Sequence, residues 1–356
     1  MIKVRTRDFI HSTDDLYFAS TNYLHPDNRI ICFLRYIPDP NGDREKNGKR
    51  YSKVNSEEAY KYLRENYPEY LYYSEVTNVE MMGVPIEKVD EIIKPENRLK
   101  EIREGKDIKV SDETRNKLID LSDFFHYIAG IDYENLGISG STCPGLQKTE
   151  SSDLDFVVYG LENHRKAVNT FKKYHDQEVE VGEGDSKRKI TLNPIQNQFW
   201  ERLYHKRIKD DSLTKEEFCW YESRKFNRGV IRGTLFDILC TRNFDEIEGK
   251  WEDTIYEPQG IAKVECTISN ALEFMDNPAV YEIKDVKVLE GPDVEISKLA
   301  SFTHTYAGEV FENEEAVARG KLEKVITKGK EPKYRILVGS TRESLGEYIK
   351  LKESPV

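Results

Sequence analysis

The spacing of apolar and polar residues divides the chain into three stretches of different character. In residues 1–108, β-prone runs such as 29–36 occur beside a helical pattern at 57–66, which predicts an α+β domain. Residues 109–256 switch to helix, strand, turn, strand and helix, which predicts a mixed β-sheet with helices. Residues 257–356 predict a small β-barrel or sandwich. The chain is therefore expected to be an α+β protein of three domains.

Capping and helix-breaking residues set the expected helix boundaries. Ser56 is the expected N-cap of the helix at 57–66. Ser111, which two acids follow, is the expected N-cap of an amphipathic helix that Gly130 closes. The charged stretch 98–110 between these two helices is expected to be a linker. Further helices are expected at 162–175, 195–208 and 215–227.

The C-terminal stretch reads as a series of short strands with turn residues between them. The regular spacing of these strands favours a small barrel or sandwich, of which the oligonucleotide-binding barrel is one type. Three aromatic residues could stack on bases, although packing in the core is the commoner outcome for such residues. The aromatic residues are Tyr281, Tyr306 and Phe311, and the expected strands are 260–268, 279–283, 286–288, 316–320 and 334–338.

Two acids stand at the start of an apolar, β-prone run. Asp153 and Asp155 are two positions apart, so on a strand their side chains point to the same face. Adjacent carboxylates repel each other, and Mg²⁺, which prefers hard oxygen ligands, is a usual counter-charge. An Asp-x-Asp pair also occurs in turns and on solvated strand edges. The buried character of residues 156–159 favours a site, because charges at the mouth of a buried strand need a partner.

A turn and a third acid add to this pair. An apolar strand at 136–138 leads into Ser139-Gly140-Ser141-Thr142, a turn that can aim backbone N–H groups and hydroxyls at a phosphate. Asp237 lies within another β-prone run, 232–240. If this strand pairs with the first, three carboxylates converge and could hold two metal ions about 3.5–4 Å apart. The alternative is an edge strand whose outward face holds Asp237.

These motifs together resemble the DNA polymerase β-type nucleotidyltransferase superfamily. The resemblance consists of Gly140-Ser141, eleven further residues, Asp153-Leu154-Asp155 and the later Asp237, and it covers residues 111–241. The order helix, strand, turn, strand, helix is also that of the superfamily, so the central domain is expected to be a nucleotidyltransferase domain. The resemblance implies transfer of a nucleoside monophosphate from a nucleoside triphosphate to an acceptor hydroxyl, with release of pyrophosphate.

The resemblance also implies roles for particular residues. Asp153 and Asp155 would bind two Mg²⁺ ions, for which Mn²⁺ could substitute. Asp237 would complete the catalytic metal site and help to deprotonate the attacking hydroxyl. The residues implied to hold the β- and γ-phosphates, through hydroxyls and amides, are Gly140, Ser141 and Thr142.

Cations for the triphosphate are harder to place. Many members of the superfamily carry Arg or Lys directly after the Gly-Ser pair, whereas this chain has an insert, residues 143–148, in which the first basic residue is Lys148. Residues 187–232 are rich in Lys and Arg, and there Arg228 and Arg232 approach the strand of Asp237. A guanidinium at that place could hold a phosphate bidentately. N-terminal cations could form a substrate surface, but a solvated hairpin is favoured for Arg35, Arg44, Lys49, Arg50 and Lys53.

Composition narrows the choice of partners. The formal net charge of -11 on 356 residues argues against broad, non-specific binding to nucleic acid. The chain shows no signal peptide and no apolar run long enough for a membrane span, so we expect no membrane partner and a cytoplasmic location. The five cysteines are scattered without CxxC spacing, which predicts neither a zinc site nor a disulfide-linked partner.

The acceptor of the transferred group is left open by these residues. An RNA 3′ end fits the basic segment and the C-terminal barrel, and we favour it slightly. A hydroxyl on a small molecule or a protein fits the acidic overall charge. A different class of function is a catalytically inactive nucleotide- or RNA-binding protein on the same fold. The remaining alternative is that the acidic pair is structural and the resemblance accidental.

Overall fold

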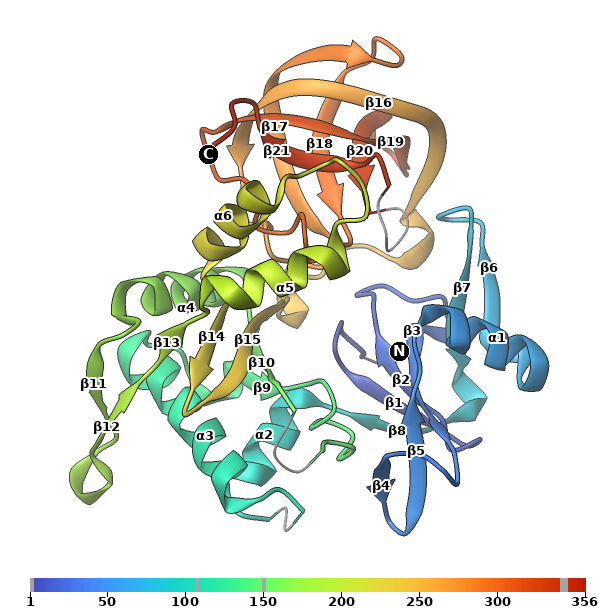
Figure 1. Cartoon of the computed structure of the whole chain (residues 1–356). Coiled ribbons are helices and arrows are strands. Elements are labelled where there is room, and N and C mark those ends of the chain that lie inside the picture. The colour runs from blue at the N-terminus through green and yellow to red at the C-terminus, as the bar shows by residue number, and fades with distance from the viewer. Residues whose placement is uncertain (1–2, 107–108, 149–151, 340–344) are drawn as a thin grey trace. The chain divides into compact units, whose positions relative to one another are not determined.

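The computed structural model describes residues 3–106, 109–148, 152–339 and 345–356 (Figure 1). It is a mixed α+β protein, as the apolar pattern predicts, with four β-sheets in this part of the chain. The chain divides into two compact units. The first unit contains most of the first two predicted domains, whereas residues 194–226 group with the C-terminal stretch. The first unit consists of Met1–Glu75, Val79–Asn193 and Asn227–Trp251, and the second of Val76–Asn78, Pro194–Phe226 and Glu252–Val356.

A curled sheet of eight strands forms the N-terminal part of the first unit. One of its cores contains Phe18 and Leu34 together with Leu63 of α1 (Ser56–Asn66). A second core joins Tyr36 of this sheet to Leu146 in the turn of the central domain. The strands are β1 (Phe9–Ser12), β2 (Tyr17–Ser20), β3 (Arg29–Pro38), β4 (Arg44–Lys46), β5 (Lys49–Lys53), β6 (Leu71–Ser74), β7 (Val79–Pro85) and β8 (Val89–Ile93).

Two expectations about the N-terminal helices were wrong. The N-cap of α1 is Asn55 and not Ser56, because the Asn55 side chain accepts from the Glu58 N–H while Glu58 returns a bond to the Asn55 N–H. The stretch from Arg98 onward does not begin as a linker, because α2 (Pro95–Arg103) includes it. Pro95 opens this helix, and the spacing of its buried residues, Leu99 and Ile102, is helical despite the surrounding charges.

The central sheet has the strand order β13-β14-β15-β10-β9. Two of its inner strands, β10 and β15, run parallel, and helix, strand, turn, strand and helix follow each other as predicted. Ser111 is the N-cap of α3, as expected, and accepts from the Thr114 N–H at 3.2 Å. The elements are α3 (Asp112–Asp123), β9 (Leu136–Ile138), β10 (Leu154–Tyr159), α4 (Leu161–Tyr174), β11 (Glu178–Val181), β12 (Arg188–Thr191), β13 (Asn193–Pro194), β14 (Arg228–Ile231) and β15 (Thr234–Thr241).

The second unit contains a ring-like sheet and two helices. The sheet has the order β16-β17-β18-β20-β19-β21, and an additional pairing of β16 with β19 closes the ring. Tyr281 and Tyr306 are core residues of this unit, since both are at most 2% exposed and the Tyr281 hydroxyl donates to the Tyr306 carbonyl. The elements are α5 (Asn197–Arg207), α6 (Lys215–Lys225), β16 (Thr254–Asn270), β17 (Ala279–Glu290), β18 (Ile296–Ser301), β19 (Glu315–Thr327), β20 (Lys333–Val338) and β21 (Tyr348–Leu351).

A buried charge cluster lies within the second unit. The Lys225 ammonium, which is fully buried, is 2.7 Å from Glu222 Oε1 and 3.1 Å from Glu309 Oε2, and it donates to the Thr305 carbonyl at 2.6 Å. Burial raises the pKa of Glu309 to about 8, while the charge of Lys225 opposes this shift.

No helix among the described residues has the length and apolar character that crossing a membrane requires.

We expect Lys225→Ala to destabilise the second unit by about 3–5 kcal/mol, because the substitution removes the buried cation that Glu222 and Glu309 share and leaves Glu222 with the longer contact to Arg207 at 3.7 Å. Lys206→Ala, which removes an exposed lysine of α5, should change the free energy of unfolding by less than about 0.5 kcal/mol. Urea denaturation followed by tryptophan fluorescence measures both. Similar small losses for the two variants would contradict a stabilising role for the Lys225 cluster.

Candidate active site

The pairing of β10 with β15 brings the predicted acids to one place. In the parallel register Asp155 lies opposite Asp237. The neighbouring pairs in the register, Leu154 with Phe236 and Phe156 with Ile238, are buried. Asp153 precedes β10 by one residue and shares the face of Asp155. Because β15 is an inner strand of the sheet, the alternative that placed Asp237 on an edge strand was wrong. Three carboxylates therefore gather on one side of the central sheet.

The ionisation of these acids shows how closely they affect one another. The pKa of Asp153 is raised by burial and then by the negative charge of Asp237. Burial also raises the pKa of Asp155, which the charge of Asp153 raises further, while the cations Arg7 and Lys53 oppose the shift. Burial, which disfavours the charged form of a carboxyl group, is thus the main cause of both raised pKa values, and the neighbouring acid adds to it.

Gly140 brings the predicted phosphate turn against Asp155. Its φ is +58°, and a Cβ at this position would lie 1.7 Å from Asp155 Oδ2. The Ser139 N–H, next in the chain, donates to the Asp155 carbonyl at 2.9 Å. Only glycine combines this backbone conformation with so close an approach. The Gly-Ser turn and the acid pair are therefore parts of one site.

The rest of the turn is held by its own hydrogen bonds. The Leu146 N–H donates to the Ser141 carbonyl at 2.9 Å, and the Gly145 N–H donates to the Thr142 carbonyl at 3.1 Å. The Thr142 carbonyl also accepts from Arg98 Nε at 3.1 Å. Thr142 is only 2% exposed, whereas Ser141 is half-buried. Of the two predicted hydroxyl ligands, Ser141 is the accessible one.

Arg228, which was predicted to bind a phosphate, forms an ion pair with Asp237. The two residues are opposite each other in the β14–β15 register. Arg228 Nε lies 2.6 Å from Asp237 Oδ1, and Nη2 donates to Oδ2 at 3.1 Å, so the guanidinium holds the carboxylate bidentately. A predicted phosphate ligand and a predicted metal ligand thus form a pair with each other.

The other two predicted cations are held by carboxylates outside the acid triad. Lys148 forms an ion pair with Asp43, which precedes β4. Arg232 forms an ion pair with Asp120 of α3, and Arg188 binds the same carboxylate at 2.7 Å. The basic segment 187–232 is moreover shared between the two compact units. It does not form one basic surface on the first unit.

The donor chemistry of the triad fits a divalent cation, but the arrangement of its side chains does not yet form a metal site. Carboxylate oxygens are the ligands that Mg²⁺ and Mn²⁺ prefer. Among the described residues, however, no three His, Cys, Asp or Glu side chains are close enough together to hold a metal. Asp237 is engaged by Arg228. A metal would therefore require Asp237 to leave this ion pair.

Three cations from the N-terminal part of the first unit lower the pKa of Asp155, and the sequence interpretation did not assign them to the site. Lys53 lies opposite Tyr36 in the β3–β5 register, so both side chains share the sheet face that packs on the turn. Arg35 stands at an irregularity of the β2–β3 pairing, where the register skips one residue. Such bulges re-aim side chains, often beside active sites. The charges of both Lys53 and Arg35 lower the pKa of Asp155.

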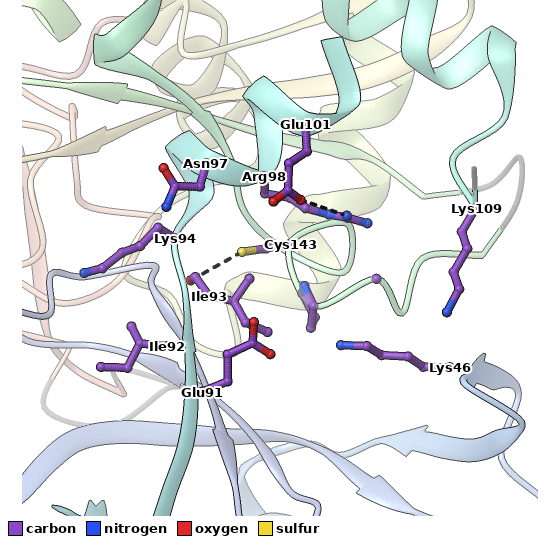
Figure 2. Close-up of a pocket in the computed structure, with 12 residues that line it drawn as sticks. Lys46, Glu91, Ile92, Ile93, Lys94, Asn97, Arg98, Glu101, Lys109 and Cys143 are labelled. Carbon is purple, nitrogen blue, oxygen red and sulfur yellow. Dashed lines mark hydrogen bonds and ion pairs between the residues drawn. The ribbon is translucent and has the colours of Figure 1, made fainter. Parts of the chain in front are cut away.

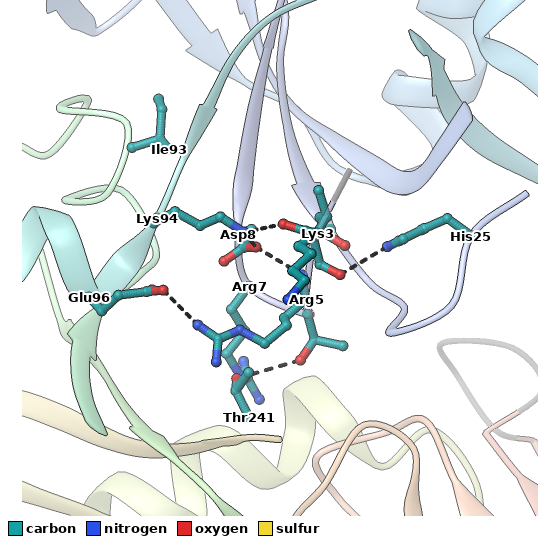
Figure 3. A network of polar contacts seen from close by, with 12 residues as sticks. Lys3, Arg5, Arg7, Asp8, His25, Ile93, Lys94, Glu96 and Thr241 are labelled. Carbon is teal, nitrogen blue, oxygen red and sulfur yellow. Dashed lines mark hydrogen bonds and ion pairs between the residues drawn. The ribbon is translucent and has the colours of Figure 1, made fainter. Parts of the chain in front are cut away.

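Arg7 is the third of these cations. Its Nε donates to the Cys240 carbonyl of β15 at 3.2 Å, and its carbonyl accepts from Ser139 Oγ at 2.9 Å. Neighbouring residues fix the segment, as Figure 3 shows: Arg5 binds Glu96 and Asp8 binds Lys94. Arg35 and Lys53 stood among the cations flagged in the sequence, but the pattern favoured a solvated hairpin. No motif pointed to Arg7.

Comparison with known proteins places the chain in a family. It is 43% identical, over 362 residues, to "Uncharacterized protein MJ1086" of Methanocaldococcus jannaschii, with 99% of this chain and 100% of the relative covered. The chain belongs to the same family as that protein, whose name assigns no activity. No family model and no solved structure matches the chain.

We expect Gly140→Ala to cost more stability than Gly130→Ala. Both glycines have positive φ, +58° and +67°, so both variants carry a conformational cost of about 1–2 kcal/mol. At Gly140 the added methyl group would also meet Asp155, whereas nothing lies within 4 Å at Gly130. The clash should add about 1–3 kcal/mol. Urea denaturation measures the free energy of unfolding of both variants. Equal decreases would show that the turn can move away from Asp155 at no cost in stability.

Proposed function

We propose that the protein is a Mg²⁺-dependent nucleotidyltransferase, which transfers a nucleoside monophosphate from a nucleoside triphosphate to an acceptor hydroxyl and releases pyrophosphate. The observation that carries the proposal is the contact of Gly140 with Asp155, in register with Asp237. It places a turn suited to phosphate beside carboxylates suited to a metal. This combination corresponds to the motifs that resemble the polymerase β-type superfamily.

The acids would divide the metal ligation between them. Asp153 and Asp155 would hold two Mg²⁺ or Mn²⁺ ions, with Asp237 as a further ligand of one of them. The bound ions would supply charge stabilisation for the attacking and leaving oxygens at phosphorus. Asp237 is also the proposed acceptor of the proton of the attacking hydroxyl.

Substrate binding would rearrange the pair of Arg228 and Asp237. A triphosphate offers oxygen acceptors to the guanidinium, and a metal ion offers a counter-charge to the carboxylate. Arg228 could therefore exchange the carboxylate for a phosphate, and Asp237 could exchange the guanidinium for a metal ion. The 2.6 Å contact between Arg228 Nε and Asp237 Oδ1 would be the resting state of this exchange.

The N-terminal sheet would supply the cations that the Gly-Ser turn lacks. Lys148 is paired with Asp43, so it is a poor candidate for the triphosphate. Arg7, Arg35 and Lys53 act electrostatically on Asp155 and are better placed. Ser141 would hold a phosphate oxygen from the other side. The first two predicted domains would then act together as one nucleotide-binding unit.

The acceptor is the less determined half of the reaction. The strand order of the ring-like sheet, with β18 parallel to β20, corresponds to that of the oligonucleotide-binding barrel and supports an RNA 3′ end. Tyr281 and Tyr306 are unavailable for stacking because they are buried. A hydroxyl of a small molecule or a protein is the alternative acceptor. The closed pair of Arg228 and Asp237 favours one further candidate, a nucleotide- or RNA-binding protein without turnover.

Incubation with α-³²P-labelled nucleoside triphosphates, Mg²⁺ and RNA, or a cell extract, should label an acceptor. We expect Asp153→Asn and Asp237→Asn to reduce labelling by about 10²–10⁴-fold, because they remove proposed metal ligands and the proton acceptor. Asp185→Asn, at an exposed acid in the β11–β12 turn, is the matched control. Absence of labelling, or equal labelling by all variants, would rule out the transferase.

Lys53→Ala should weaken binding of a non-hydrolysable triphosphate analogue about tenfold, because a hydrogen bond to a charged group is lost. Lys49→Ala, which removes an exposed cation of the same strand that pairs with Asp15, should leave the affinity within about twofold. Isothermal titration calorimetry with Mg²⁺ measures both. Equal affinities for the two variants would show that the N-terminal sheet does not contact the triphosphate.

A further inference from the structure

The N-terminal segment 3–8 carries one of the cations of the candidate active site, Arg7. The Arg7 carbonyl accepts from Ser139 Oγ at 2.9 Å, and the Arg7 Nε donates to the Cys240 carbonyl of β15 at 3.2 Å. Of the cations that lower the pKa of Asp155, Arg7 has the largest effect. The place of Arg7 between the Gly-Ser turn and β15 therefore affects any ligand of the acid triad.

The backbone holds Arg7 in a conformation that arginine disfavours. Its φ is +73°, in the left-handed region that favours glycine. The Asp8 N–H donates to the Arg5 carbonyl at 3.2 Å, and the Arg5 N–H donates to Asp8 Oδ2 at 2.8 Å, so two hydrogen bonds close the turn around Arg7. Without the second bond, we expect Arg7 to relax to a negative φ, which would redirect its side chain.

The Asp8 side chain closes this turn through one oxygen atom. Asp8 is fully buried, and its Oδ2 accepts from the Arg5 N–H and from the Lys94 ammonium, the latter at 2.5 Å (Figure 3). Its Oδ1 is buried as well and has no hydrogen-bond partner among the described residues. The turn therefore requires a single acceptor oxygen, at the position of Oδ2.

Lys94 connects this oxygen to a strand that the Gly-Ser turn also contacts. Lys94 follows Ile93, the last residue of β8, whose carbonyl accepts from the Cys143 thiol at 3.7 Å (Figure 2). Cys143 belongs to the insert after the Gly-Ser pair and is buried. The end of β8 thus contacts the turn of Arg7 through Lys94 and the Gly-Ser turn through Cys143.

The charge of Asp8 disfavours the folded chain. Burial raises the pKa of Asp8 to about 6, while the charge of Lys94 opposes this shift. Because this pKa is higher than the ordinary value of the unfolded chain, the contribution of Asp8 to the free energy of unfolding decreases as the pH rises through about 6. An Asn side chain offers an acceptor oxygen without the charge. We therefore expect Asp8→Asn to keep the turn closed, whereas Asp8→Ala opens it.

We propose that Asp8 is a positioning residue of the candidate active site, which holds Arg7 between the Gly-Ser turn and β15 by closing the turn around it. The conformation of Arg7 supports this inference, because an arginine stands where glycine would fit with less strain. The consequence for ligands rests on the proposed function, in which the guanidinium of Arg7 contacts the triphosphate. An open turn would then lower the affinity for the triphosphate.

Isothermal titration calorimetry with Mg²⁺ and the non-hydrolysable triphosphate analogue tests this role. We expect Arg7→Gly, which suits the positive φ and removes the guanidinium, to weaken binding about tenfold. Asp8→Ala should weaken binding to a similar extent, and the double variant no further, because Asp8 acts through Arg7. Asp8→Asn should stay within about twofold of the wild type. Ser12→Ala, which removes another buried oxygen that accepts a backbone N–H, at the other end of β1, is the matched control.

Hydrogen exchange without ligand provides a second measurement. The Arg7 N–H donates to the Ser20 carbonyl at 2.9 Å, so its exchange reports on the order of the turn. We expect its protection to fall about tenfold in Asp8→Ala, because a hydrogen bond to a charged group is lost. Protection in Asp8→Asn and in Ser12→Ala should follow the wild type.

Four results would overturn the positioning role. They are additive losses of affinity in the double variant, equal losses in Asp8→Ala and Asp8→Asn, equal losses in Asp8→Ala and Ser12→Ala, and unchanged protection of the Arg7 N–H in Asp8→Ala. If the wild type binds no triphosphate analogue, the proposed function fails, and the exchange of the Arg7 N–H, which needs no ligand, decides the positioning role by itself.

Discussion

The parallel pairing of β10 with β15 is the constraint on which the first unit depends. It fixes Asp155 beside Asp237, in strands whose other side chains are mostly buried. Two carboxylates in such neighbouring positions raise the free energy of the folded protein unless cations surround them. Arg228 satisfies one acid directly, and the charges of Arg35 and Lys53 in the N-terminal sheet and of Arg7 just before it lower the pKa of the other. The acid pair is therefore one of the links between the two sheets of the first unit.

The contact between these sheets is built from apolar as well as charged groups. Tyr36 and Tyr51 of the N-terminal sheet pack in one core with Cys143 and Leu146 of the turn. Under the proposed function, this apolar anchor would stand where the superfamily pattern has a basic residue after the Gly-Ser pair. Cations of the N-terminal part of the first unit, which lower the pKa of Asp155, would then take the place of that residue.

The local features of the fold were predictable from the sequence, whereas the long-range ones were not. The order of elements around the Gly-Ser turn and the acid pair, the Ser111 cap and the strand of Asp237 follow from periodicity and capping over a few residues. The register of β10 with β15 could only be hypothesised, because nothing local states which strands pair. The cap of α1 was misplaced by one residue, since Asn55 and Ser56 both suit that position.

In the candidate site, too, the sequence identified residues by their local pattern but did not reveal which residues the fold brings together. Asp153, Asp155 and Gly140 were identifiable because their chemistry is unusual for their positions along the chain. Lys53 and Arg35 looked like the cations of any exposed hairpin, and only the folded chain shows that their charges lower the pKa of Asp155. Arg228 and Arg232 looked alike in sequence. The strand register assigns the first to Asp237, while Asp120 of α3 takes the second.

The pair of Arg228 and Asp237 has a consequence for any ligand of this site. A bidentate, half-buried ion pair stabilises the folded protein without ligand, so opening it costs free energy that binding must offset. A metal ion alone would recover the interaction with Asp237 but would leave Arg228 without an anion. A triphosphate alone would recover the interaction with Arg228 but would leave Asp237 among like charges. If the proposed function is correct, only the two together would replace both halves of the pair, so the site would favour a metal–triphosphate complex over either component.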